Sequence, residues 1–440
     1  MRKTGKSIKG VRTRVAPSPT GFAHVGTAYV ALFNYAFAKK HGGQFILRLE
    51  DSDVKRNVPG AEEAIYKGLS WLGLSWDEGP DIGGSYGPYR ESEKLEIYQG
   101  QAKKLVGEGK AYEDNGAIRF KNPGEEVSWN DLIRGVITFP GEEITDFVIM
   151  KSDGYPTYNF AVVVDDIEMK ISHVIRGEEH ISNTPRQLAI YKALGVVSPQ
   201  FAHLPTLRNF ERKKLSKRRD PVDLRIYQKE GYLPEALVNF LCLLGWSHPE
   251  EKEVFSLNEF VTSFDLGRVR KAGPIFDVKK LDWINGVYIR NLDDNTLSDL
   301  VGKYLSVSVS EDFLRQVVPL IKERISKLSE AENLLSFFWE RPSLQPELFS
   351  PHGVSHVASA ARALGEISDW ILEDVNNKLG ELIAEKKFKT GEFYMSLRLA
   401  LTGKRVTPPI NESIVILGQD EVIHRLEEAE KVLVEVGARV

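Results

Sequence analysis

Hydrophobic and polar positions near the start of the chain follow first a strand pattern and then a helix pattern. Residues 11–16 form a short apolar-rich stretch, which Pro17 and Pro19 end because proline removes a ladder donor and fixes φ. From Val25, apolar residues recur at helical spacing as far as the glycine pair at 42–43. This order of strand, loop and helix predicts the beginning of a parallel α/β layer.

The α/β pattern is interrupted once and then resumes. Between residues 109 and 156, short strands at 117–120 and 135–139 lie between turn signals and predict an inserted β-rich subdomain. From Tyr158 the α/β pattern returns. Further elements are expected at residues 44–50, 61–72, 92–106, 171–175 and 184–195.

The remainder of the chain has a helical pattern. Helices are predicted at 234–244 and 278–285, and almost everything after residue 291 has helical spacing. In the last segment one apolar stripe faces charged residues and consists of Val422, Leu426, Ala429 and Leu433. We therefore expect all-α domains at the C-terminal end.

Composition is typical of a globular protein with several domains. The chain has 440 residues, of which 27% are charged and 42% hydrophobic, so two to four domains are expected. The formal net charge is −4, so binding to RNA would have to use local basic patches.

Cysteine content and apolar runs exclude several classes of protein. Cys242 is the only cysteine and lies in the apolar run 240–244, which predicts a buried, inert thiol. A single cysteine excludes disulfides within the chain and cysteine-cluster zinc sites. No apolar run approaches the ~20 residues needed to span a bilayer, and the basic N-terminus is not followed by the apolar region of a secretory signal. A cytoplasmic location and no membrane partner are expected.

The loop before the first helix has the features of a phosphate site. Free backbone N–H groups and the positive end of the helix dipole meet there, next to His24 and Gly26. A strand, loop and helix without a ligand is an equally compatible interpretation of this segment alone, with His24 beside the helix cap.

A basic cluster over residues 213–219 favours the phosphate-binding interpretation of the loop before the first helix. On its own it is typical of a solvated loop. Together, however, His-Val-Gly-Thr at 24–27 and Lys-Leu-Ser-Lys-Arg at 214–218 resemble the two signatures of class I aminoacyl-tRNA synthetases. The flanking segments resemble bacterial-type glutamyl-tRNA synthetases, and they are residues 16–27, 45–53, 154–160 and 174–180.

The resemblance implies ATP-dependent activation of L-glutamate to glutamyl-adenylate and transfer to the 3′ end of tRNA(Glu), by a monomer that requires ATP and Mg²⁺. It implies catalytic roles for His24, Lys214 and Lys217, which would stabilise the phosphates and the leaving pyrophosphate. The ATP-binding residues that it implies are Pro17, Ser18, Gly21, His24, Gly26, Thr27, Glu179, Leu207, Lys214, Ser216, Lys217 and Arg218.

A glutamate pocket needs arginine for bidentate carboxylate capture and an acid for the ammonium group. By resemblance, Arg14 takes the side-chain carboxylate, Glu50 the ammonium group, and Tyr158 and Arg176 make further contacts. We expect Arg48 to alternate to the other face of its strand as a structural ion pair. The full set of glutamate-binding residues implied is Arg14, Ala16, Ser18, Glu50, Tyr158 and Arg176.

Two arginines are candidates for RNA contacts. Arg90 is expected to contact the acceptor end, and Arg324 falls where relatives that reject tRNA(Gln) place an arginine. The insert at 109–156 is shorter than in most relatives and lacks the Cys/His zinc module that they often carry, so no zinc is expected.

The resemblance implies a Rossmann-type class I catalytic domain split by a β-rich insert and followed by all-α domains. We expect a catalytic domain at 1–93 and 157–209, a shortened acceptor-binding insert at 94–156, a stem-contact domain with a KMSKS-type loop at 210–289, and an anticodon-binding domain at 290–440.

Alternative functions remain open. They are a non-discriminating enzyme that also charges tRNA(Gln), and a catalytically silent tRNA-binding paralogue. A truncated relative that loads glutamate onto a tRNA base is disfavoured, because such proteins lack the helical block after residue 291. Glutaminyl-tRNA synthetase is also disfavoured, since residues 16–21 match the glutamyl version of the motif.

Overall fold

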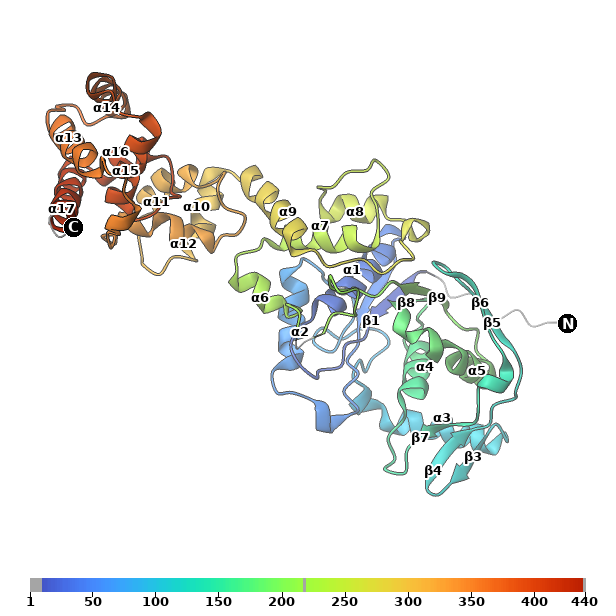
Figure 1. Ribbon diagram of the computed structural model, residues 1–440. Coiled ribbons are helices and arrows are strands. Elements are labelled where there is room, and N and C mark those ends of the chain that lie inside the picture. The colour runs from blue at the N-terminus through green and yellow to red at the C-terminus, as the bar shows by residue number, and fades with distance from the viewer. Residues whose placement is uncertain (1–9, 217–218, 438–440) are drawn as a thin grey trace. The chain divides into compact units, whose positions relative to one another are not determined.

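The computed structural model describes residues 10–216 and 219–437 of a chain that divides into two compact units (Figure 1). The larger unit holds the described residues up to Gln228 together with Leu233–Ile284. The smaller unit holds Lys229–Tyr232 and the described residues from Asn285 onward. The expected fold class, an α/β catalytic region with a β-rich insert followed by helices, is confirmed.

Two pairs of parallel strands form the centre of the larger unit. β1 pairs with β2 so that Arg14 lies opposite Ile46, and β8 pairs with β9 so that Arg176 lies opposite His203. Figure 1 shows β1, β8 and β9 next to one another, and the Ser172 N–H donates to the Arg12 carbonyl between β1 and β8. The elements of this part are β1 (Arg12–Val15), α1 (Val25–Lys40), β2 (Gln44–Leu47), α2 (Ala61–Trp71), α3 (Leu95–Gly107), α4 (Tyr158–Glu168), β8 (His173–Gly177), α5 (Thr184–Leu194) and β9 (Gln200–Leu204).

Helix α1 covers these strands and begins at the candidate phosphate loop. It packs on β1, β2 and β8, and its apolar residues Leu32, Phe33 and Ala36 are fully buried. His24 is the N-cap residue and His41 follows the last turn, so the helix ends just before the predicted glycine pair. The periodicity of the sequence therefore located this helix correctly.

The insert contains two separate β-structures. β3, β4 and β7 form one antiparallel sheet, and β5 and β6 form a hairpin. The N–H of Leu132 in the hairpin turn donates to the Phe201 carbonyl on β9, so the hairpin is joined to the central strands. The predicted short strands are confirmed, and the elements are β3 (Ala111–Asp114), β4 (Ala117–Phe120), β5 (Val127–Asp131), β6 (Gly135–Phe139) and β7 (Phe147–Met150).

The rest of the larger unit and the smaller unit are helical. Helix α9 runs across the division between the units, and the smaller unit has a hydrophobic core built from α13 to α17. The predicted apolar stripe of α17 is buried in that core. These helices are α6 (Leu224–Lys229), α7 (Pro234–Gly245), α8 (Leu257–Ser263), α9 (Val278–Asn291), α10 (Asp294–Gly302), α11 (Glu311–Val317), α12 (Glu330–Leu335), α13 (Gly353–Gly365), α14 (Leu372–Lys386), α15 (Thr390–Thr402), α16 (Ile410–Leu417) and α17 (Gln419–Gly437).

Some predicted boundaries are wrong by a few residues. The strand expected at 44–50 ends at Leu47, because the following N–H groups turn to other partners: Leu49 donates to the Tyr89 carbonyl and Glu50 to the Pro17 carbonyl. The helix expected from residue 92 begins as a 3₁₀ turn and becomes α-helical at Leu95. The irregular backbone after β2 is what brings Glu50 to the end of the sheet.

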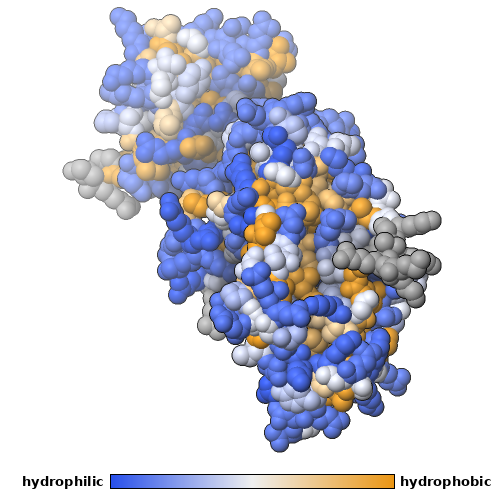
Figure 2. All heavy atoms as spheres, turned by 90° about the vertical axis from the view of Figure 1, so that its right-hand side faces the viewer, coloured by the Kyte–Doolittle hydropathy of each residue, from blue (hydrophilic) through white to orange (hydrophobic). Residues whose placement is uncertain are grey.

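The surface of the larger unit that carries the β5–β6 hairpin is mixed in polarity. Figure 2 shows hydrophilic residues over most of this face, with hydrophobic residues gathered in one stretch of it.

Among the residues that the structure describes, no helix is both long enough and apolar enough to cross a membrane.

Candidate active site

A cavity of about 320 Å³ lies at the carboxyl ends of the central strands. Parallel strands place ligand sites at this edge, so the position agrees with the fold. The cavity gathers residues from β1, the loop before α1, the segment after β2, α4 and the end of β8. Its lining consists of Arg14, Val15, Ala16, Pro17, His24, Gly26, Thr27, Val30, Glu50, Tyr158, Arg176, Gly177, Glu179, His180 and Lys214.

Most of the residues implied by the resemblance meet in this cavity. Leu207 lines a smaller neighbouring cavity of about 70 Å³, which shares His24, Gly26, Glu179 and Lys214 with the larger one. Three of the predicted residues line neither cavity, namely Ser18, Gly21 and Ser216. Lys217 and Arg218 lie outside the described residues.

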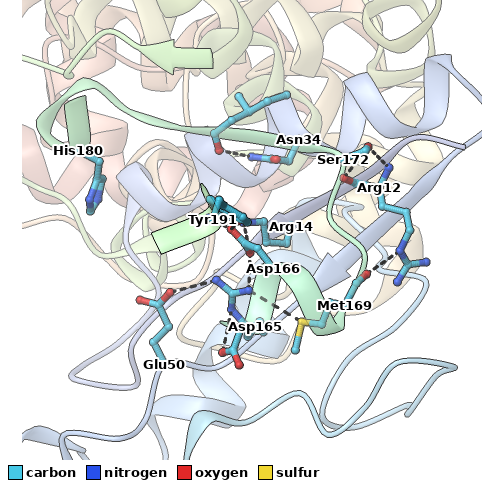
Figure 3. Close-up of polar contacts among 12 residues, drawn as sticks. Arg12, Arg14, Asn34, Glu50, Asp165, Asp166, Met169, Ser172, His180 and Tyr191 are labelled. Atoms are coloured by element: carbon cyan, nitrogen blue, oxygen red, sulfur yellow. Dashed lines mark hydrogen bonds and ion pairs between the residues drawn. The ribbon is translucent and has the colours of Figure 1, made fainter. Parts of the chain in front are cut away.

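Arg14 is held in the site by Asp166 of α4. Its Nε donates to Asp166 Oδ1 at 3.0 Å and its Nη2 to Oδ2 at 3.4 Å (Figure 3). Arg48 Nη1 donates to the same Oδ1 at 2.6 Å. Burial favours a raised pKa for Asp166, but the charges of Arg14 and Arg48 outweigh burial and lower its pKa, so the carboxylate is ionised.

Arg48 takes part in a structural ion pair, as expected. The prediction that its side chain lies on the opposite face of the strand is wrong. It is fully buried and donates to Asp166 and, through Nη2, to Glu50 Oε1 at 3.4 Å. It therefore lies on the same side as Arg14 and not on the opposite face. The register explains the error: Arg14 lies opposite Ile46, and alternation with a period of two puts Arg48 on the same face as Ile46.

Glu50 reaches the cavity beside this network. Burial raises the pKa of Glu50, and the neighbouring Arg48 and Arg14 oppose that rise. In Figure 3, Glu50 and Asp165 lie near Asp166, and His180 stands apart at the upper left. Glu50 thus places a carboxyl group in the cavity lining beside the guanidinium groups.

Sequence reasoning missed the acids and the lysine that support this network. Asp165 is fully buried and accepts from Lys94 Nζ at 3.1 Å and from the Tyr98 hydroxyl at 2.7 Å. Adjacent aspartates within the otherwise apolar run 160–167 were the available signal, because buried carboxylates require cationic partners.

Arg176 is held in the cavity wall without a carboxylate partner in any of its hydrogen bonds. Its Nε lies 3.2 Å from His203 Nε2, and its Nη2 donates to Thr184 Oγ1 at 2.8 Å and to the His180 carbonyl at 3.4 Å. Its Nη1 is buried and has no hydrogen-bond partner among the described residues. Burial lowers the pKa of Arg176, and no carboxylate among the described residues contacts its guanidinium to oppose that shift directly.

His24 faces the cavity from the N-terminus of α1. Its Nδ1 accepts from the Gly26 N–H at 2.9 Å, which places the ring proton on Nε2. A Cβ at position 26 would come within 3.0 Å of His24 Nδ1, so glycine gives the ring its space. The donor on Nε2 and the helix terminus together suit a phosphate oxygen.

Lys214 lines both cavities. Its Nζ lies 2.8 Å from Glu179 Oε1. Burial favours a raised pKa for Glu179, but the hydrogen bond from Lys214 outweighs it and lowers the pKa. The basic loop predicted from the sequence therefore contacts the segment after β8 through an ion pair.

The two predicted RNA contacts lie outside the cavity lining. Arg90 is paired with Glu62 and, at 3.3 Å, with Glu93. Arg324 is exposed on a turn of the smaller unit between α11 and α12. No group of three or more His, Cys, Asp or Glu side chains suited to a metal ion occurs in the described part of the chain.

Two family models together match most of the chain. The model of the catalytic domain of class I tRNA synthetases (E and Q) matches residues 10–117 and 113–283. The model of an anticodon-binding domain matches residues 296–430.

Curated proteins and solved structures agree with these matches. The glutamate–tRNA ligase of Acidothermus cellulolyticus is 42% identical and is covered over 95% of each chain. Glutamate–tRNA ligase 1 of Fervidobacterium nodosum is 39% identical, over 94% of this chain and 98% of its own. A crystal structure of a glutamate tRNA ligase from Elizabethkingia meningosepticum in complex with its amino acid superposes with a TM-score of 0.85 at 33% identity, over 97% of this chain and 100% of that one.

Proposed function

The chain belongs to the class I tRNA synthetases of the glutamyl and glutaminyl type, and from this premise we propose that its central cavity is where glutamate and ATP react. The protein acts as a glutamate–tRNA ligase, which activates L-glutamate with ATP and transfers it to tRNA(Glu). The observation that carries the assignment of the site is the cavity that joins Arg14, Arg176 and Glu50 to His24 and Lys214.

Charge balance around the amino-acid end supports glutamate as the occupant. Arg176 makes its hydrogen bonds to neutral acceptors, so its guanidinium can still take an anion. Glutamate would bring a second carboxylate to the site, whereas glutamine would bring a neutral amide in its place and leave a guanidinium without an anion. Leaving a buried charge unpaired costs free energy, and this cost would make the site reject glutamine.

The nucleotide end would hold ATP against the loop before α1. The His24 Nε2 proton and the N-terminus of α1 face the same space, where they would stabilise charge on the α-phosphate during attack by the glutamate carboxylate. Lys214 would stabilise the negative charge of the leaving pyrophosphate. Lys217, which lies outside the described residues, would do the same. ATP would extend from the larger cavity toward the small neighbouring one beside Leu207.

The protein's contribution to this step is alignment and charge stabilisation. The attacking carboxylate already carries its negative charge, so no base has to remove a proton from it. Mg²⁺ would enter bound to ATP, held mainly by phosphate oxygens and water, and we assign it no protein ligand.

The assignment as a glutamate–tRNA ligase also suggests which parts of the protein bind tRNA and where the protein is located. The smaller unit, which matches an anticodon-binding domain over residues 296–430, would bind the tRNA anticodon, and Arg90 would contact the acceptor end. We propose a cytoplasmic monomer with the domain boundaries given above. Arg324 is exposed and would distinguish tRNA(Glu) from tRNA(Gln).

Charging assays test the function. Purified protein with ATP, Mg²⁺ and labelled glutamate is expected to charge tRNA(Glu), and Lys217→Ala is expected to lower the rate roughly 100-fold by removing charge stabilisation. Lys213→Ala is the matched control, because Lys213 lies in the same loop and pairs with exposed Glu211 at 2.8 Å. Its rate should stay within about twofold of wild type.

The choice of tRNA decides between the alternatives. Charging of tRNA(Glu) alone would support the role of Arg324. Charging of tRNA(Gln) as well would remove the Arg324 assignment and leave the ligase function in place. If neither tRNA is charged while ATP and RNA still bind, the protein is a silent paralogue and the proposed function is overturned.

A further inference from the structure

Asp131 and His203 form a buried pair directly behind the proposed amino-acid pocket. Asp131 ends β5 in the insert and is 2% exposed, and His203 lies in β9 and is fully buried. Asp131 Oδ2 and His203 Nδ1 are 2.5 Å apart. Neither side chain lines the cavity, so their connection to it runs through Arg176.

Arg176 fixes the direction of the hydrogen bonds that link Asp131, His203 and Arg176. His203 Nε2 lies 3.2 Å from Arg176 Nε and 3.3 Å from the Thr184 hydroxyl oxygen. A guanidinium only donates, so Nε2 must present a lone pair to Arg176, and the Thr184 hydroxyl can donate to the same nitrogen. The ring proton is therefore on Nδ1 and donates to Asp131. Burial lowers the pKa of His203, so the imidazole is neutral near pH 7. The Asp131 carboxylate thus selects the one tautomer that accepts from Arg176.

Asp131 is itself fixed by the backbone around it. Its Oδ1 accepts from the N–H groups of Ile133 at 3.0 Å, Arg134 at 2.9 Å and His203 at 3.3 Å. Arg134 also extends its Nη2 to Glu178 Oε2 at 2.7 Å. The turn of the β5–β6 hairpin is therefore attached both to β9 and to the segment that follows β8.

These contacts leave one nitrogen of Arg176 for a ligand. Nε is taken by His203 and Nη2 by Thr184, while the Phe201 ring lies 5.3 Å from the guanidinium carbon. Nη1 is the buried nitrogen without a hydrogen-bond partner among the described residues. The groups that accept from Nε and Nη2 are neutral, so the Asp131 carboxylate acts on Arg176 through the imidazole and does not contact the guanidinium directly.

We propose that Asp131 and His203 are positioning residues that hold Arg176 for a carboxylate of the bound amino acid. The inserted β5–β6 hairpin is then a part of the amino-acid site as well as of the insert. This inference rests on the proposed function, since it takes glutamate as the ligand of Arg176.

Asp131→Asn tests the role of the tautomer. The amide oxygen can still accept from the backbone N–H groups, but the amide nitrogen would donate to His203 Nδ1 and move the ring proton to Nε2, where it faces the Arg176 donor. The KM for glutamate in ATP–pyrophosphate exchange with tRNA present should rise roughly tenfold, while the KM for ATP stays unchanged. Asp114→Asn is the matched control, since Asp114 is in the same insert and pairs with Arg119 away from the cavity.

His203→Gln separates positioning from a structural effect. Glutamine offers a carbonyl oxygen to Arg176 without needing a tautomer, so the KM for glutamate should stay within about threefold of wild type. In that background, Asp131→Asn should add little to the KM, whereas a merely structural aspartate would add the same increase in both backgrounds. The melting temperature of every variant is measured beside the kinetics.

The outcomes separate this inference from the proposed function. If Asp131→Asn and Asp114→Asn have the same KM for glutamate, or if the Asp131→Asn effect is equal in both backgrounds, the positioning role is overturned. If the wild-type protein shows no glutamate-dependent exchange, the proposed function fails. Calorimetric binding of glutamate then decides the inference, and affinity that still depends on Asp131 upholds it.

Discussion

Arg14 and Asp166 form a buried ion pair in which Nε and Oδ1 are 3.0 Å apart and each side chain is 4% exposed. The same carboxylate oxygen accepts from Arg48 at 2.6 Å, so one aspartate compensates two guanidinium groups. Arg14 is thereby fixed in position while its charge is only partly cancelled. The geometry explains how an arginine can be buried at the cavity and still attract an anionic ligand.

Asp166→Asn should damage both stability and glutamate binding. Removing one partner of a buried ion pair typically costs 3–5 kcal/mol, and here two arginines lose their shared anion. We expect the free energy of unfolding in urea to fall by about 3 kcal/mol and the KM for glutamate to rise.

Asp153→Asn is the control for this prediction, because the Asp153 side chain is 60% exposed and pairs with Lys151 on the surface. Its unfolding free energy should stay within about 0.5 kcal/mol of wild type. An Asp166→Asn protein as stable as this control would contradict the view that Asp166 compensates the arginines.

His24→Asn should separate the helix cap from the phosphate donor. Asparagine is a good N-cap residue, so α1 keeps an acceptor for the Gly26 N–H. The donor on Nε2 is lost, and the rate of glutamate-dependent pyrophosphate exchange should fall roughly 100-fold. The melting temperature should match that of wild type.

His24→Ala supplies the comparison, since alanine loses both the cap and the donor. It should be as inactive as His24→Asn and also less stable by about 1 kcal/mol. If His24→Asn keeps wild-type exchange activity, then His24 serves the helix alone and has no role in the chemistry.

The elements that the sequence predicted well are those with a local signal. The helix from Val25 and the strands at 117–120 and 135–139 depend on periodicity and on nearby turn residues, and the structure has them where they were expected. The start of α3 was less accurate, because a 3₁₀ turn over Glu91–Lys94 precedes it and no local pattern distinguishes that turn from the helix.

The candidate site was accessible from the sequence only through motifs. The lining around His24 and Lys214 follows from segments that resemble a known family, whereas the partners of Arg48 do not. Arg48 meets an aspartate 118 positions later, and Arg176 depends on Asp131 of the insert through His203. Such pairings arise from tertiary packing, which one sequence does not encode as a local pattern.

Cys242 should be inert in the folded protein. It is fully buried in α7, and burial raises the pKa of its thiol well above the usual value. Reaction with a thiol reagent at pH 8 should be at least about 1,000-fold slower than in urea, because it requires opening of the structure. Mass spectrometry of the labelled protein measures this. Complete labelling of folded protein within the mixing time would contradict the buried position.

Glu91 should make stability depend on pH. Burial, followed by the charge of Glu50, raises the pKa of Glu91 to about 8, whereas an unfolded chain would have a pKa near the ordinary 4.5. The folded state therefore holds a proton that the unfolded state releases. This contribution to stability is fully present below about pH 4.5 and is lost as the pH rises through 8.

Glu91→Gln removes that dependence, because glutamine imitates the protonated acid and can still accept from Ser52, whose Oγ lies 2.7 Å from Glu91 Oε2. The variant should be more stable than wild type by roughly 1–3 kcal/mol at pH 9, with a smaller difference at pH 5. Urea unfolding across this range measures the effect. Glu93→Gln is the matched control, since the Glu93 side chain is 47% exposed and pairs with Arg90 at the surface. A Glu91→Gln gain that is the same at pH 5 and pH 9 would contradict the raised pKa, because only ionisation of the acid links the gain to pH.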